Sequence, residues 1–118
     1  MLKFNGKTVY LACGDTDMHK SIGGLSAIVE CSFGLDAFGG ALFVFCNRTR
    51  DRVKILEWAG DGFWLYCKRL EGGKFRWPGE GENQTMTLTG EELHLLLVLV
   101  FTLCTGSKSE KNESKKWC

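Results

Sequence analysis

The chain reads Ala41-Leu-Phe-Val-Phe-Cys46, then Asn47-Arg-Thr-Arg-Asp-Arg52, then Val53-Lys-Ile-Leu-Glu-Trp58. The first segment is apolar on both faces, which is typical of a strand in the interior of a sheet. The third segment has the pattern of a second strand, and the six polar residues form the loop between them. The sequence therefore predicts an antiparallel pair of strands whose connecting loop carries three arginines.

A third strand is expected at residues 63–68. Ala59-Gly-Asp-Gly62 precedes it, and the Asp-Gly step is a strong hairpin signal. The three strands therefore make an antiparallel meander. Since side chains alternate along a strand, the third strand has two sets of residues, Phe63, Leu65 and Cys67 on one face and Trp64, Tyr66 and Lys68 on the other. We expect the first face to join the core and the second to be aromatic and basic.

A first helix is expected before the meander. A short strand at residues 8–12 is followed by Gly14-Asp15-Thr16, which suits a turn and a helix N-cap. Apolar residues then recur at helical spacing, and they are Met18, Ile22, Leu25 and Val29. This spacing predicts one buried helical stripe.

A second helix is expected after the meander and a possible last strand at residues 84–88. Thr89-Gly-Glu-Glu92 is a capping box, and Leu88 and Leu93 are placed as a hydrophobic staple. Leu93, Leu96 and Leu97 supply the buried stripe. The predicted fold class is α+β, a small antiparallel β-meander sheet with two helices packed on one face. We expect one domain over residues 1–97 and a tail, apolar and then charged and of low complexity, over residues 98–118.

The composition restricts the class of protein. A chain of 118 residues fits one domain, and a net charge of +1 excludes a general polycation, so any affinity for nucleic acid must come from local clustering. The six cysteines have no Cys-x-x-Cys spacing, so we expect no structural metal. The start of the chain lacks a signal-peptide pattern, and the apolar run at residues 95–104 is too short to span a bilayer. We therefore expect a cytoplasmic bacterial protein without a membrane contact.

The arginine loop is the first candidate for a DNA-binding site. Arginine's planar fork suits phosphate, although these arginines also fit a solvated loop in which Asp51 pairs locally. Further cations could extend the line of phosphate contacts beyond the loop. Their alternative role is to protect edge strands from aggregation. The candidate DNA-binding residues are Arg48, Arg50, Arg52, Lys54, Lys68, Arg69, Lys74 and Arg76.

Large aromatic residues lie between these cations. Rings interleaved with positive charge can stack on bases or anchor a partner protein, but more often such rings fill a small core. Trp64 and Tyr66 share a face with Lys68, so we expect these two rings to make the contacts.

No catalytic site is expected. Five carboxylates invite comparison with a two-metal centre, and they are Asp15, Asp17, Asp51, Glu57 and Asp61. Each has a structural explanation as a cap, a turn residue or a partner of nearby cations. Neither histidine has a nearby nucleophile in an activating context. We therefore expect no enzyme activity, no metal and no cofactor, with a metal-dependent nuclease subunit as an alternative.

Several motifs occur in order along the chain. They are Val9-Tyr-Leu-Ala, Asp17-Met-His-Lys-Ser21, Gly40-Ala-Leu-Phe-Val-Phe, Asn47-Arg, Asp51-Arg-Val-Lys-Ile-Leu, Gly62-Phe-Trp-Leu-Tyr, Lys68-Arg-Leu and Phe75-Arg-Trp-Pro. Together, from about residue 7 to residue 97, they resemble the small TnpB accessory protein, or second open reading frame product, of the IS-sixty-six group of bacterial insertion sequences. The resemblance implies a role in transposition beside a larger transposase, which carries the catalytic carboxylates, and another small accessory protein.

The chain departs from this resemblance after Leu97. The family implies a polar, basic helical ending, whereas this chain continues as Val98-Leu-Val-Phe-Thr-Leu-Cys104. We interpret the tail as the product of a frameshift in the gene. The nucleotide sequence tests this hypothesis, because a neighbouring frame should restore a polar ending.

The sequence therefore predicts a non-catalytic accessory protein for DNA transposition. We expect it to bind the DNA ends of the insertion sequence, the transposase, or both. The alternative is a pure protein adaptor, which contacts the transposase and touches no DNA.

Overall fold

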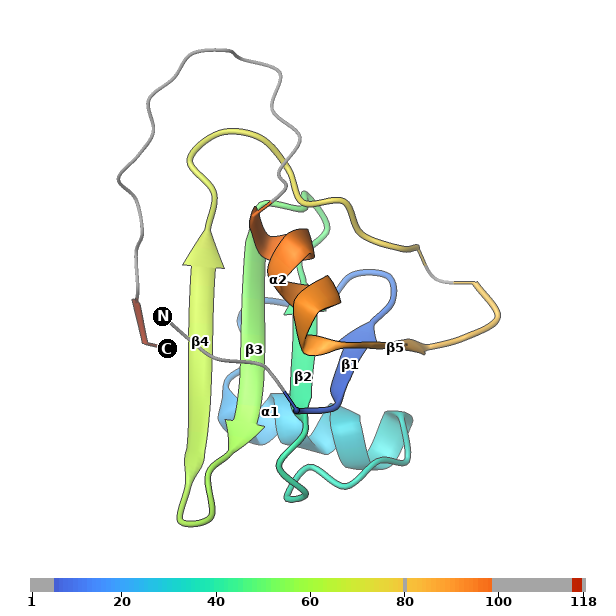
Figure 1. Cartoon of the computed structure of the whole chain (residues 1–118), viewed down its shortest axis with the longest axis vertical. Coiled ribbons are helices and arrows are strands. Elements are labelled where there is room, and N and C mark those ends of the chain that lie inside the picture. Colours follow the sequence, from blue (N-terminus) through green and yellow to red (C-terminus); the bar gives the residue numbers. More distant parts are fainter. Residues whose placement is uncertain (1–5, 80, 99–115, 118) are drawn as a thin grey trace.

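The structure is a computed structural model that describes residues 6–79, 81–98 and 116–117. A mixed sheet lies at its centre, with strand order β5-β1-β2-β3-β4-β6. The strands are β1 (Val9–Ala12), β2 (Leu42–Cys46), β3 (Arg52–Trp58), β4 (Phe63–Arg69), β5 (Thr85–Leu88) and β6 (Lys116–Trp117). The helices are α1 (Ile22–Ala27), which continues as a π-helical turn η1 (Ile28–Ser32), and α2 (Gly90–Val98). The predicted α+β class is confirmed (Figure 1).

The antiparallel meander is present as predicted. β2 pairs with β3, and β3 pairs with β4, both antiparallel. In the turn between β3 and β4, the Ala59 N–H donates to the Gly62 carbonyl at 2.7 Å. All five residues of β2 are buried, as expected of an interior strand.

The sheet is not purely antiparallel, and here the prediction is wrong. β1 lies parallel to β2, with Val9 opposite Leu42. A parallel pair needs a long crossover connection, and the segment that contains α1 supplies it. β5 pairs antiparallel to the other side of β1, so β1 separates it from the meander.

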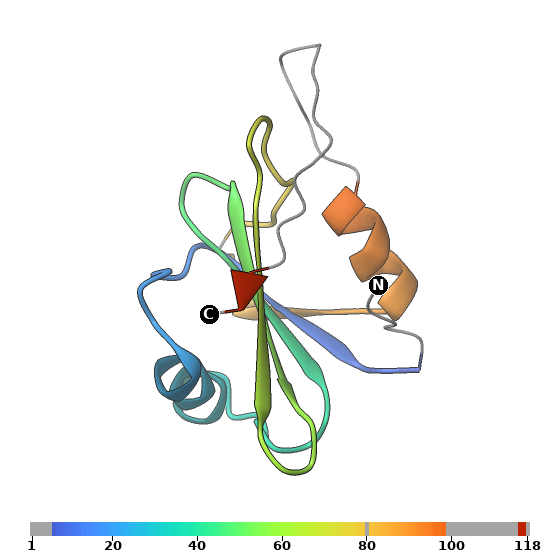
Figure 2. The same cartoon turned by 90° about the vertical axis from the view of Figure 1, so that its left-hand side faces the viewer.

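The two helices lie on opposite faces of the sheet, so their predicted placement on one face is also wrong (Figure 2). On one face, Leu25 and Val29 of the α1–η1 segment pack in a cluster with Phe43 and Phe45. On the other face, Leu93 of α2 joins a second cluster. The physical reason is the composition of β2, whose alternate side chains are apolar in both directions and need cover on both sides.

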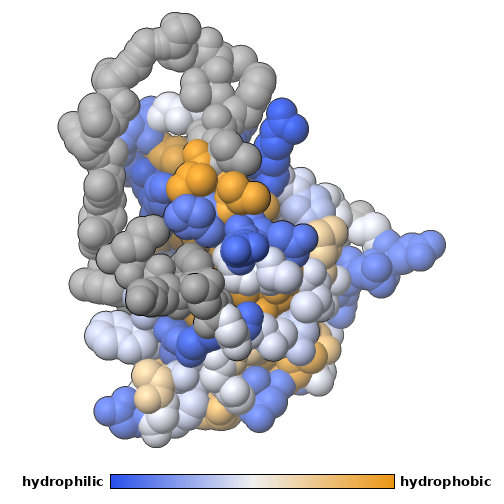
Figure 3. Space-filling model, in the orientation of Figure 1, coloured by the Kyte–Doolittle hydropathy of each residue, from blue (hydrophilic) through white to orange (hydrophobic). Residues whose placement is uncertain are grey.

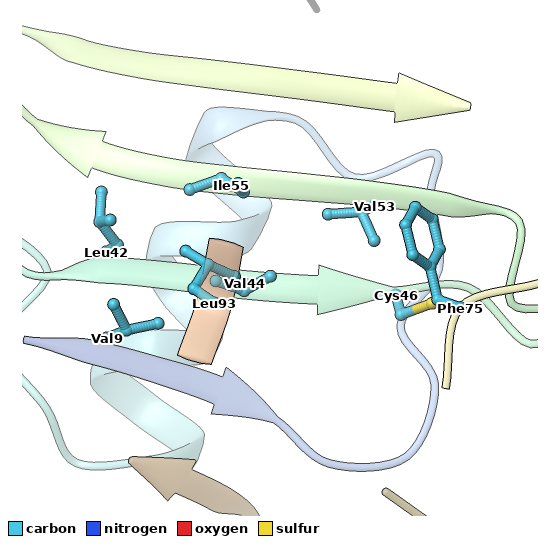
Figure 4. Close-up of a cluster of buried hydrophobic side chains, with 8 residues drawn as sticks. All are labelled: Val9, Leu42, Val44, Cys46, Val53, Ile55, Phe75 and Leu93. Atoms are coloured by element: carbon cyan, nitrogen blue, oxygen red, sulfur yellow. The ribbon is translucent and has the colours of Figure 1, made fainter. Parts of the chain in front are cut away.

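Figure 4 shows the second cluster, which consists of Val9, Leu42, Val44, Cys46, Val53, Ile55, Phe75 and Leu93. Tyr66 packs against it, and the ammonium of Lys68 donates to the Leu97 carbonyl at 3.3 Å. The face of β4 that was predicted to be an aromatic and basic surface is therefore partly core and partly covered by α2.

α2 begins as its capping box predicts. The Thr89 N–H donates to Glu92 Oε1 at 2.9 Å, and the Glu92 N–H donates to Thr89 Oγ1 at 3.0 Å. Leu93 belongs to the second cluster, and Leu88, Leu96 and Leu97 pack against it. Apolar surface also gathers over the exposed side of α2, at Leu95 and Val98 (Figure 3).

The first helix begins later than predicted. Its N-cap is Ser21 rather than Asp15 or Thr16. The carbonyls of Met18 and Lys20 accept hydrogen bonds from Lys54 Nζ, at 2.7 and 2.9 Å, instead of from helical N–H groups. The predicted apolar stripe is nevertheless correct, because Leu25 and Val29 are fully buried.

Most of the predicted tail, residues 99–115 and 118, lies outside the described residues. Lys116 and Trp117 pair with Cys67 and Tyr66 at the edge of β4. Among the residues described here, no helix has the length and apolar character needed to cross a membrane.

Candidate nucleic-acid interface

The loop between β2 and β3 is built around Asn47. Its Oδ1 accepts from the N–H groups of Asp51 and Arg52, at 3.0 and 3.1 Å. Its Nδ2 donates to Asp51 Oδ1 at 2.8 Å and to Thr49 Oγ1 at 3.1 Å. The hydrogen bond from Asn47 Nδ2, and secondly one that Thr49 Oγ1 donates to Asp51 Oδ1 at 2.9 Å, hold the pKa of Asp51 below its ordinary value. The arginine loop is therefore internally braced.

The segment after β4 is joined to this loop through the backbone. The Leu70 N–H donates to the Asp51 carbonyl, and the Phe75 N–H donates to the Arg50 carbonyl, both at 2.8 Å. Lys74 Nζ donates to the Thr49 carbonyl at 3.0 Å. Two segments that are separated in the sequence thus form one corner of the molecule, at the upper end of β3 and β4 in Figure 1.

Arg50 holds this corner from within. It is the one residue other than glycine with a positive φ, 64°, in the described chain. Its guanidinium donates to the Gly14 carbonyl at 2.7 Å and to the Asn47 carbonyl at 3.4 Å. The Arg50 side chain is therefore hydrogen-bonded to backbone carbonyls of the protein itself.

Two predicted lysines are also engaged inside the fold. Lys54 lies on the α1 face, where its ammonium binds the Met18 and Lys20 carbonyls. Burial, and secondly the charge of Arg52, lower the pKa of Lys54. Lys68 lies on the α2 face and binds the last turn of α2.

The other predicted cations are exposed residues at the corner. The Arg48 side chain is 88% exposed and makes a 3.3 Å ion pair with Asp15. Arg52 and Arg69 lie directly opposite each other on β3 and β4, and both are exposed. Arg69 has a 3.5 Å ion pair with Glu71. We define the basic corner as the five exposed cations Arg48, Arg52, Arg69, Lys74 and Arg76.

The net charge of the chain conceals this local clustering. Residues 47–54 and 68–76 contain eight cationic side chains and two carboxylates, Asp51 and Glu71. Both segments meet at the same end of the β3–β4 hairpin. A phosphate backbone is the ligand whose charge suits such a cluster.

The two predicted contact aromatics lie elsewhere. Trp64 is 48% exposed and stacks on Tyr66 with ring centroids 6.0 Å apart. The Tyr66 hydroxyl donates to Glu57 Oε1 at 3.0 Å, and burial together with this carboxylate raises the pKa of Tyr66 to about 12. Trp64 also pairs with Glu57 across the strands, away from Arg69. The structure does not bring Trp64 to the basic corner.

Sequence reasoning missed two features. The first is Asn47 as the organiser of the loop, for which the signal was an asparagine directly before a turn. The second is a contact among the rings of Phe38, Trp58 and Phe63, for which the signal was a phenylalanine in a glycine-rich loop. In the described part of the chain, no three His, Cys, Asp or Glu side chains form a group that could hold a metal ion.

Comparison with known proteins supplies the family. Residues 7–100 match the family described as IS66 Orf2 like protein. Two similar proteins come from Sinorhizobium fredii, and both are described as uncharacterized. The protein y4hO is 34% identical over 89 residues, 75% of this chain and 76% of that protein. The protein y4jC is 32% identical over 92 residues, 78% of each chain.

No solved structure is significantly similar to this chain. The family match covers most of the chain and confirms the resemblance seen in the sequence motifs. It supports an accessory role in transposition. The chain belongs to the IS66 Orf2-like family, the TnpB accessory proteins of bacterial insertion sequences.

Proposed function

We propose that this protein is a non-catalytic accessory factor that binds the DNA backbone at insertion-sequence ends through its basic corner. The observation that carries the proposal is the exposed pair of Arg52 and Arg69 on neighbouring strands. Like charges placed directly opposite each other destabilise a sheet. A bound phosphate removes this repulsion, so the pair is better suited to the DNA complex than to the free protein.

The rigidity of the corner supports the same function. Side chains on a braced loop lose less conformational entropy on binding than side chains on a loose one. Asn47 and Arg50 brace the loop that carries Arg48 and Arg52, and they do so without using those two guanidinium groups. Arginine's fork can then bind phosphate oxygens in pairs.

The family relation supplies the biological setting. We place the protein in the bacterial cytoplasm, where it would assist the transposase and the other small accessory protein of the element. It would contribute affinity for the element ends and leave the cleavage and joining of strands to the transposase. Lys54, Lys68 and Arg50 would support the fold, and Lys74 and Arg76 would extend the phosphate track.

The test is fluorescence anisotropy of purified protein with duplex DNA from the element end, across a salt series. We expect the triple variant Arg48→Ala, Arg52→Ala, Arg69→Ala to weaken binding. The salt slope should fall by roughly one for each phosphate contact that is lost. Arg50 is left intact, because its substitution would disturb the loop itself.

Lys7→Gln is the matched control, because it also removes one cation. Lys7 pairs with Glu57 on the α2 face, away from the basic corner. It should leave the salt slope unchanged, whereas Arg52→Gln should lower it. If the triple variant binds with the affinity and salt slope of the natural protein, the proposal fails. If the folded protein binds no DNA, the pure adaptor for the transposase becomes the better function.

A further inference from the structure

The end of the β3–β4 hairpin opposite the basic corner carries an aromatic cluster. Phe38 comes from the loop before β2, and Trp58 and Phe63 flank the β3–β4 turn. The ring centroids are 5.0 Å apart for Phe38 and Trp58, 5.2 Å for Phe38 and Phe63, and 4.9 Å for Trp58 and Phe63. We define the aromatic tip as these three residues with the neighbouring carboxylates of Asp36 and Asp61.

The loop holds Phe38 in an exposed position. Phe38 is 51% exposed, although its ring contacts the rings of two half-buried residues. The Phe38 N–H donates to Asp36 Oδ1 at 2.9 Å, and the Ala37 N–H donates to Glu30 Oε2 at 3.2 Å. Ala37 is fully buried and anchors the loop in the core below α1. These two hydrogen bonds and the buried Ala37 therefore fix the loop that carries the exposed Phe38 ring.

The charge at this end is opposite to that of the basic corner. Residues 30–46 and 55–67 contain four carboxylates and no lysine, arginine or histidine. One of the four, Glu57, is paired with Lys7 on the α2 face. β3 is seven residues long, so the two ends of the hairpin are separated by about 20 Å. A ligand at one end leaves the other end open.

Two possible occupants fit the aromatic tip poorly. DNA is disfavoured because phosphate is repelled by the carboxylates. The second occupant is the basic corner of another copy of the chain, which would supply positive charge. The aromatic residues beside that corner are not available, because Phe75 is buried and Trp77 donates from Nε1 to the Ala12 carbonyl. That corner therefore lacks an apolar side chain to place on the rings.

We propose that the aromatic tip docks a protein segment in which an apolar side chain is flanked by lysine or arginine, and that the transposase of the same element supplies this segment. Large rings at the centre of an interface with charges at its rim are the usual arrangement of binding hot spots. The choice of partner rests on the proposed accessory function. The protein would then hold DNA at one end of the hairpin and the transposase at the other.

The experiment measures binding of the full-length protein to the purified transposase by biolayer interferometry at several salt concentrations. We expect Phe38→Ala to weaken binding at least about tenfold. The double variant Asp36→Asn, Asp61→Asn should weaken it several-fold and reduce its salt dependence, while asparagine keeps the acceptor for the Phe38 N–H. Transposase peptides that contain an apolar residue flanked by lysine or arginine should compete with the intact transposase for binding to the natural protein.

Trp64→Ala is the matched control. Trp64 is about as exposed as Phe38, 48% against 51%, but it lies on the opposite face of the hairpin. Its replacement should leave the affinity for the transposase unchanged. Thermal unfolding and DNA anisotropy are measured for each variant, so that loss of the fold or of the basic corner is detected separately.

The outcomes separate this inference from the proposed DNA contact. If Phe38→Ala binds the transposase as well as the natural protein does, or if no transposase binding occurs, the inference is wrong. It is also wrong if Phe38→Ala abolishes only self-association, seen by analytical ultracentrifugation. If DNA binding is absent but transposase binding is sensitive to Phe38→Ala, the DNA proposal fails and the docking surface stands.

Discussion

At the scale of residues, the arginine loop contains both an internal guanidinium and exposed ones. Arg48, Arg50 and Arg52 alternate in the sequence and look equivalent there. In the structure, Arg50 binds the Gly14 carbonyl, while Arg48 and Arg52 are exposed. The sequence shows the cluster of arginines, but it does not distinguish the internal guanidinium of Arg50, because the nearer of its two partners, the Gly14 carbonyl, lies in a distant loop.

Asp51 gives a pH-dependent prediction at this scale. Its folded pKa is lowered, so its ionised form contributes stability above the unfolded pKa near 4, and this contribution is lost as the pH falls through the folded pKa. We expect Asp51→Asn to cost about 1 kcal/mol at pH 7, a modest value because the side chain is partly exposed. The difference from the natural protein should shrink below about pH 4. Urea unfolding at a series of pH values measures it, and a difference that is constant with pH contradicts the assignment.

At the scale of elements, local sequence signals predicted the helix start and the turn correctly. They did not predict the face of the sheet on which each helix lies. The capping box of α2 and the β3–β4 turn were correctly predicted, because each depends on neighbouring residues. The placement of α1 and α2 on one face was wrong, because it depends on which face each crossover reaches. The pattern of β2 contained the answer, since a strand with apolar residues in both directions requires two covered faces.

The capping box gives a prediction for an element. Thr89→Ala removes the acceptor for the Glu92 N–H, so we expect a loss of about 1 kcal/mol in the free energy of unfolding. Thr87→Ala is the control, because Thr87 is an exposed threonine on the adjacent edge strand β5. Chemical denaturation compares the two variants. Equal losses would show that the cap itself contributes little.

At the scale of the whole molecule, the nearly neutral net charge conceals two opposite ends. The basic corner and the aromatic tip lie at opposite ends of the same hairpin. If the protein binds DNA as proposed, this charge asymmetry would orient it in the field of the DNA before contact. Five of the eight predicted cations form the basic corner. The sequence indicated this cluster because the cations lie close together along the chain, and their contact with DNA stays a prediction. The sequence could not predict that Trp64 lies far from them or that Phe38 meets Trp58, because these relations arise from the register of β3 and β4 and from the loop before β2.

The pairing of β1 with β5 has a consequence for how the protein is made. Val9, near the start of the chain, pairs with Leu88, so β1 lacks one neighbour until most of the chain has been synthesised. Contacts between such distant residues slow folding, and an unpaired strand edge promotes aggregation in the meantime. We expect a chain that ends at Asn83 to be unfolded by circular dichroism, and a chain that ends at Val98 to unfold cooperatively. A nascent chain would then present a finished basic corner only late in translation, which would delay DNA capture until the protein is nearly complete.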